Sequence, residues 1–163
     1  MSELKSSLSQ SREYSAIEGN LLLHGVEPNT IRQVKDDEIL WAFHTFNRIS
    51  CIMRLYGVGD DLFLSIETAF GVVDTTKENA EVSHRIAIEN TRIPNLARVG
   101  IYRDQSVSLC VIQIWFQCGH VDPSAIGGLI ELSVDQAEEI RAKLIGLSGF
   151  DLLPASWFSQ LLN

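Results

Sequence analysis

The chain has 163 residues, of which 45% are hydrophobic and 21% charged, and its formal net charge is −8 at pH 7. This composition is typical of a globular protein and excludes a largely disordered chain. The acidic balance argues against nucleic acid and anionic membrane surfaces as partners, because both need a basic footprint. We therefore expect one domain with short tails, whose acidity suits basic or apolar segments of a protein partner.

The cysteine pattern points to a reducing compartment. Cys51, Cys110 and Cys118 are odd in number and form no CxxC motif, so a disulfide framework is not expected and the cytoplasm is the predicted location. Cys51 and Cys110 lie within apolar strands, which predicts inert core thiols. No stretch has the apolar run of a signal peptide or the length of a membrane span.

The first half of the chain predicts a helix followed by a strand meander. Residues 1–11 are polar and predict a disordered arm. A helix is expected over Arg12–His24, with Gly25 as its C-cap and with an inner face of Tyr14, Ile17, Leu21 and Leu22. Four strands follow, an edge strand over Thr30–Val34 and then Glu38–Phe46, Ile49–Tyr56 and Leu62–Phe70. The turns between them are Lys35–Asp37, Asn47–Arg48 and Gly57–Asp61.

A helix and a hairpin form the centre of the chain. Thr75–Glu78 fits a capping box, which predicts a helix near Thr76–Thr91 that Pro94 ends. Its inner stripe is predicted to contain Val82, Ser83, Ile86, Ala87 and Asn90. The period then becomes two, with strands over Ala97–Arg103 and Val107–Phe116 around a turn at Asp104–Ser106. The second strand is apolar on both faces, so we expect it to lie centrally or at a subunit contact.

The last part of the chain predicts a loop and a closing helix. Cys118–Leu132 contains Asp122–Pro123 and Gly127–Gly128 and is expected to be a loop. A second capping-box match at Ser133–Gln136 begins a helix near Val134–Ile145, which Gly146 and Gly149 end. Its inner face is Val134, Ala137, Ile140, Leu144 and Leu147. The expected division is a single α+β domain over 12–149 and a C-terminal tail over 150–163, with a short helix over Leu153–Leu162.

Catalytic and metal signatures are weak throughout. None of the four histidines has the HxH or HxxxH spacing that brings two ligands to one metal, and no serine lies in a GxSxG elbow. The minor candidates are better explained as turns or solvated loops: the pair His120 and Asp122, Cys118 beside His120, the acidic turns Asp36–Glu38 and Asp60–Asp61, and the Gly127–Gly128 backbone. We expect no catalytic residue, cofactor or metal.

The order helix, strand meander, helix, hairpin, helix predicts an α+β fold with a mostly antiparallel sheet of five to six strands and helices packed on one face. This layout resembles the type III secretion chaperone-like fold, which includes the YbjN-like sensory transduction regulators. The nearest sequence likeness runs from Ile86 to Phe116, through Asn90 and Pro94–Ala97. The resemblance implies a small acidic homodimer that is not an enzyme and that binds protein segments or regulates other proteins. The Gly57–Gly59 turn and the Cys118–Leu132 loop do not match it.

Two function classes remain open. The first is a non-catalytic binding or regulatory module, and the second is a small-molecule sensor or small enzyme with a pocket between sheet and helices. Large aromatic side chains are expected in the core or at a partner or dimer surface: Trp41, Phe43, Trp115 and Phe116. The apolar supply on both faces of the sheet favours a homodimer. The competing expectation is that the Leu152–Leu162 tail covers the second face and leaves a monomer.

Overall fold

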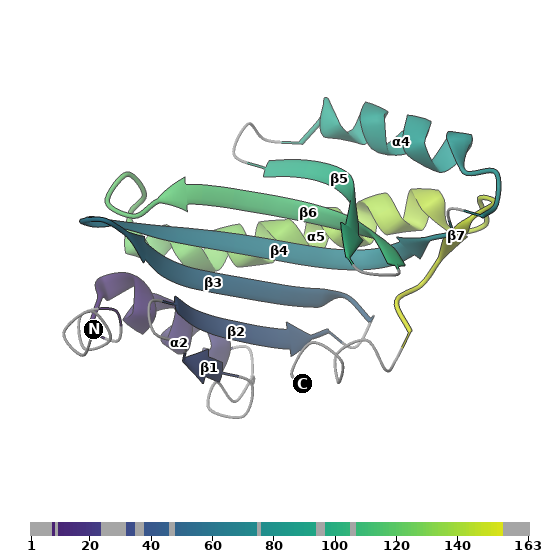
Figure 1. The fold of residues 1–163 in the computed structure, drawn as a ribbon. Coiled ribbons are helices and arrows are strands. Elements are labelled where there is room, and N and C mark those ends of the chain that lie inside the picture. The colour runs from purple at the N-terminus through teal and green to yellow at the C-terminus, as the bar shows by residue number, and fades with distance from the viewer. Residues whose placement is uncertain are drawn as a thin grey trace.

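The computed structural model in Figure 1 describes residues 8, 10–23, 32–34, 38–45, 48–74, 76–93, 97–104 and 107–154. The helices are α2 (Arg12–Leu23), α4 (Ala80–Asn90) and α5 (Ile126–Leu144), preceded by the 3₁₀ turn η1 (Pro123–Ala125). The strands are β1 (Arg32–Val34), β2 (Glu38–His44), β3 (Ser50–Val58), β4 (Asp61–Val73), β5 (Ala97–Asp104), β6 (Val107–Gln117) and β7 (Phe150–Asp151). Within this part of the chain, no helix is long and apolar enough to cross a membrane.

The strands form one antiparallel sheet in the order β1-β2-β3-β4-β6-β5, and the two-residue strand β7 pairs with the end of β4. Every pairing in this sheet is antiparallel. The helices pack on one face of the sheet, with α5 lying behind β4 and β6 in Figure 1. The predicted α+β class, the mostly antiparallel sheet and the single helical layer are confirmed.

The core follows from the two-residue period of the strands. Trp41, Met53, Ile66, Ile114 and Ala97 are successive partners across β2, β3, β4, β6 and β5. Their side chains therefore point to the same face, and all five are buried under the helices. The two-residue period thus explains why these side chains share one face, and the helices cover that face.

The prediction that a helix begins near Thr76 is wrong, and Thr75 of the predicted capping box lies outside the described residues. Asp74 takes the role of the turn former: its Oδ1 accepts from the Thr76 amide at 2.9 Å and from the Thr76 hydroxyl at 2.6 Å. The helix α4 begins at Ala80, and its N-cap Asn79 makes no side-chain cap bond.

The predicted inner stripe of α4 is also partly wrong. Val82 and Ile86 are buried as expected, but Ser83 and Ala87 are exposed and Glu89 is buried instead. The buried face of α4 therefore runs through Val82, Ile86 and Glu89, and Asn90, also predicted to lie on it, is exposed. The partners of Glu89, which explain its burial, belong to the site described below.

The predicted loop over Cys118–Leu132 is wrong as well, since η1 and the first turns of α5 lie there. Gly127 faces α2 so closely that a Cβ there would overlap the side chain of Asn20, so the glycine serves helix packing. Ser133 lies inside α5 and begins no helix. Its hydroxyl donates to the Ile130 carbonyl at 2.8 Å and shares a 2.8 Å hydrogen bond with Thr68 of β4.

Smaller differences concern α2 and the β3–β4 turn. Leu22 of α2 is 64% exposed, so it does not belong to the inner face that Ile17 and Leu21 form. The turn between β3 and β4 is shorter than predicted, because Val58 still pairs with Asp61. Leu8 is buried in the core.

Several predicted features lie outside the described residues: the rest of the arm except Gln10 and Ser11, the Gly25 cap, the Lys35–Asp37 turn, Pro94, and the terminal helix beyond Pro154.

Candidate functional site on the open face of the sheet

The face of the sheet opposite the helices carries a groove, and we call this face the open face. The groove has a volume of about 290 Å³. Its floor comes from alternate residues of β3, β4 and β6, and its wall is the β5 segment Arg98–Tyr102. In Figure 1, β5 bends in its C-terminal half, where it continues to pair with β6.

The floor of the groove is apolar at one end. Ala69 and Val111 are direct partners across β4 and β6, and Ile52 and Leu109 extend the same surface. Leu153, which follows β7, is only 1% exposed and forms a second small core there with Ala69 and Leu109. One end of the groove is thus already covered by the chain itself.

A row of polar side chains crosses the open face beside the apolar floor. Arg54 Nη1 donates to Glu67 Oε2 at 2.8 Å, and its Nε lies 3.5 Å from Glu38 Oε1. Gln113 Nε2 donates to the other oxygen of Glu67 at 3.3 Å. These groups satisfy one another across four strands. The charge of Arg54 is therefore neutralised by its carboxylate neighbours, whereas Arg98, which also lines the groove, donates from Nη1 to the Ala97 carbonyl at 2.7 Å.

Three aromatic rings continue the open face beyond the polar row. Phe63 stacks on Trp115 with ring centroids 5.1 Å apart and an interplanar angle of 14°. Tyr56 also stacks on Phe63, at 5.9 Å and 23°, and its hydroxyl accepts from the Trp115 indole nitrogen. Trp115 is still 52% exposed. The stack presents a rigid, amphipathic surface to solvent.

The wall of the groove is held from behind by α4. Asn90 Oδ1, at the end of α4, accepts from the Val99 amide at 3.0 Å. This bond satisfies an amide of an edge strand that β6 does not reach. Ile101 and Tyr102, further along β5, are exposed. The position of β5, and with it the groove, depends on where α4 lies.

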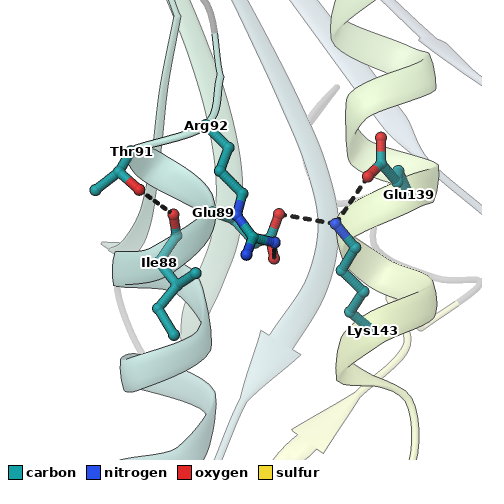
Figure 2. A network of polar contacts seen from close by, with 6 residues as sticks. All are labelled: Ile88, Glu89, Thr91, Arg92, Glu139 and Lys143. Atoms are coloured by element: carbon teal, nitrogen blue, oxygen red, sulfur yellow. Dashed lines mark hydrogen bonds and ion pairs between the residues drawn. The ribbon is translucent and has the colours of Figure 1, made fainter.

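The position of α4 is in turn fixed by a buried carboxylate, as Figure 2 shows. Glu89 is 4% exposed in its side chain and pairs with Lys143 of α5 at 2.8 Å and with Arg92 at 3.3 Å. Lys143 also donates to Glu139 at 2.7 Å. The hydrogen bonds to Glu139 and to Glu89 raise the pKa of Lys143 above its ordinary value. The network ties α4 to α5 through charge.

The structure separates the four aromatic residues that the sequence singled out. Trp41 is fully buried against α2, where its indole donates to Glu18 Oε1 at 2.8 Å, and Phe116 is buried under the helices. Phe43 is half-buried against the same core. Trp115 points to the open face and is exposed. A partner surface therefore has Trp115 available, whereas Trp41 and Phe116 belong to the core.

The sequence missed the groove because its parts are far apart in the chain. Arg54, Glu67 and Gln113 come from three strands, and the wall comes from a fourth. The sequence feature that could have indicated the groove is the second apolar face of β6, which includes Val111. This feature predicts that the open face is covered, but it does not identify the covering group.

The remaining candidate groups are structural. Burial raises the pKa of the Cys51, Cys110 and Cys118 thiols to about 12. Asp122 Oδ1 accepts from the Ser124 amide at 2.9 Å and caps η1, and this bond lowers the pKa of that carboxyl group. In the part of the chain that the structure describes, no three metal-ligating side chains gather.

The comparisons with known proteins come from structure alone. Scans of protein-family models and of curated protein sequences found no match to this chain. Among solved structures, the chain is similar to YbjN from E. coli, a proposed transcription regulator. The match has a TM-score of 0.53 and 10% sequence identity, and it covers 86% of this chain and 96% of that one. At this identity the likeness establishes the fold, so the chain has a YbjN-like α+β fold, as the sequence resemblance implied.

Proposed function

We propose that this protein is a non-catalytic regulatory module that binds an extended apolar segment of a partner protein in the open-face groove. The observation that carries the proposal is the groove itself, with an apolar floor at Ile52, Ala69 and Val111 beside the β5 segment Arg98–Tyr102. Apolar floors with few polar groups at the rim are typical of binding sites. The likeness to YbjN supports a regulatory role.

The charges of the groove support binding over catalysis. Arg54 and Glu67 bond to each other at 2.8 Å, so neither is placed as a free acid, base or nucleophile. A paired row at the rim instead sets the register of a bound segment. Three free cysteines in the chain support the cytoplasm as its compartment.

The test measures which proteins each of two variants captures from native cell extract. Both variants replace an aliphatic side chain with glutamate. Ile52→Glu places a charge on the groove floor, whereas Leu23→Glu makes the same type of change at a strongly exposed position on α2. We expect a partner to be enriched on the wild type and on Leu23→Glu and to be lost on Ile52→Glu. Its apolar segment, made as a synthetic peptide, should then shift the NMR signals of Val111 and Ala69.

Equal capture by Ile52→Glu, with thermal stability like that of the wild type, would reject the groove as the site. A synthetic segment that shifts only signals of the helical face would reject it too. Because Ile52 is half-buried and lies on the open face, its replacement leaves the helical core intact. The melting temperature of each variant checks this assumption directly.

A symmetric dimer is a second proposal, and the exposure of Trp115 favours it. This indole is stacked on Phe63 and still offers a large, rigid apolar surface, which is the kind of side chain that dominates interface energies. Sedimentation equilibrium at micromolar concentration tests the dimer. A mass near 18.2 kDa at every concentration would reject it.

A further inference from the structure

The aromatic stack of Tyr56, Phe63 and Trp115 lies on the open face beyond the groove. Phe63 and Trp115 lie nearly parallel with ring centroids 5.1 Å apart, and the Trp115 indole donates to the Tyr56 hydroxyl. The indole donor is thus satisfied within the stack, whereas 52% of the Trp115 side chain remains exposed. What Trp115 presents to a ligand is therefore ring surface.

Carboxylates flank this stack. Glu38 is the partner of the stacked tyrosine across β2 and β3, and Asp61 is an exposed residue of β4, two positions before the stacked phenylalanine and on the same face. Arg54, a neighbouring cation, contacts both Glu38 and Glu67. These three groups leave one negative charge over, and Asp61 adds a second. The chain as a whole has a net charge of −8, so the local and the overall charge both favour a cation as ligand.

A positively charged side chain is the ligand that uses both the ring and the charges. The face of an indole attracts a guanidinium or ammonium group within about 6 Å of its centroid, and Trp attracts cations more strongly than Tyr or Phe. The planar guanidinium of arginine also stacks on aromatic faces. A neutral apolar group gains nothing from the carboxylates, and an anion is repelled by them. The stack therefore suits arginine or lysine best.

The distance between the groove and the stack sets a spacing for such a ligand. Val111 lines the groove, and Trp115 lies four residues further along the same face of β6. Four residues of a strand rise about 13 Å. An extended segment that lies along β6 covers this length with about four residues of its own, because both chains have the same rise per residue.

We infer that the aromatic stack binds an arginine or lysine side chain of the partner segment whose apolar residue occupies the groove. The inference rests on the proposed function, since it names the chemistry of the segment proposed for the groove. The segment is apolar at one position and basic about four residues away. The basic residue comes before or after the apolar one, according to the direction in which the segment lies along β6.

Synthetic peptides test this pairing on the full chain. The probe is a short serine–glycine peptide with a valine–leucine–valine run and an arginine four positions after the leucine, and a second peptide has the reverse order. NMR titration follows the Val111 amide and the Trp115 indole, and both signals should shift with one of the two peptides. Citrulline, which has the shape of arginine without its charge, should weaken binding by about two- to five-fold. The citrulline peptide should still shift the Val111 amide and should leave the indole nearly unshifted.

Two variants assign the effect to the stack. Trp115→Leu keeps an apolar side chain at an exposed position and removes the indole, so the arginine peptide should lose its advantage over the citrulline peptide. Asp61→Asn should reduce this advantage in part, whereas the matched change Asp135→Asn, at an exposed position of α5, should leave it unchanged. Equal binding of the two peptides to the wild type, or a full preference for arginine in Trp115→Leu, would overturn the inference.

The two NMR signals separate this inference from the proposed function. If both peptides shift the Val111 amide equally and neither shifts the Trp115 indole, the inference fails and the proposed function stands. If the arginine peptide shifts the indole and no peptide shifts the Val111 amide, the stack binds a cation and the proposed function fails. No shift of either signal rejects both. An indole signal that moves with protein concentration and not with peptide would assign the stack to a second copy of the chain, which also overturns the inference.

Discussion

Removal of Lys143 is the sharpest test of how the groove wall is held. In Lys143→Met the side chain keeps its apolar stem, and the ammonium group that lies 2.8 Å from Glu89 is lost. Glu89 is 4% exposed, so its carboxylate cannot recover full hydration. Arg92, which is 62% exposed, remains at 3.3 Å as the other ion-pair partner. The variant therefore leaves a buried charge only partly compensated.

The expected cost follows from this burial. Breaking a fully buried ion pair typically costs about 3–5 kcal/mol. Lys143 is itself 31% exposed and Arg92 stays in place, so we expect about 2–3 kcal/mol. Glu139→Gln removes the exposed partner of the same lysine and should cost no more than about 0.5 kcal/mol. Each of these two variants removes one charge, so the difference between their stability losses reports the effect of burial.

Urea unfolding of the variants measures these differences, with the double variant Glu89→Leu, Lys143→Met as the third arm. The double variant removes both charges and should recover most of the stability that Lys143→Met loses. A loss below about 0.5 kcal/mol in Lys143→Met would show that Glu89 is hydrated, because a hydrated carboxylate does not need the lysine. The single variant Glu89→Leu is measured as well, and a double variant as unstable as the sum of Glu89→Leu and Lys143→Met would refute the coupling.

Three further outcomes are expected. Ile86→Asp should cost several kcal/mol, because Ile86 is buried between α4 and the sheet; a melting temperature within a few degrees of the wild type would contradict this. Burial raises the pKa of the Cys51 thiol from 9.0 to about 12, so the unfolded state releases this proton first and stability falls as the pH rises above about 9. In Cys51→Ala this slope should be smaller by about 1.4 kcal/mol per pH unit, measured by urea unfolding. Native protein should bind a thiol reagent at neither Cys51 nor Cys110 until it unfolds, as mass spectrometry can show.

The strands could be predicted from sequence because their signal is local. Alternation by two in Ala97–Arg103 and the apolar runs of β3 and β4 need no knowledge of distant residues. The helix α5 shows the limit of this reasoning. Gly127–Gly128 is a typical loop signal, yet Gly127 lies in the first turn of α5, where its missing side chain admits Asn20 of α2. This glycine is required by a contact between two helices whose touching residues are more than a hundred positions apart in the sequence.

The buried stripe of α4 illustrates the same limit through charge. Glu89 is not part of the stripe that the helical spacing predicts, and carboxylates are rarely buried. Its burial depends on Lys143, which is 54 residues further along the chain. No periodicity within α4 contains this information. A tertiary ion pair overrides the local rule here.

The groove combines both kinds of information, and its origin explains why a chain without catalytic signatures still has a defined surface. Strand β6 is apolar on both sides because it lies inside the sheet, and one side is satisfied by α5. On the other side Leu109 contacts Leu153 and Trp115 stacks on Phe63, so the two ends are covered by different means. The middle of β6, around Val111, has neither of these two contacts and lines the groove. The bend of β5 and the tie from Asn90 to Val99 then turn this part of the open face into a groove of fixed shape. The helices cover only one face of the sheet. Binding in the groove would use apolar surface on the other face, which the central strands expose.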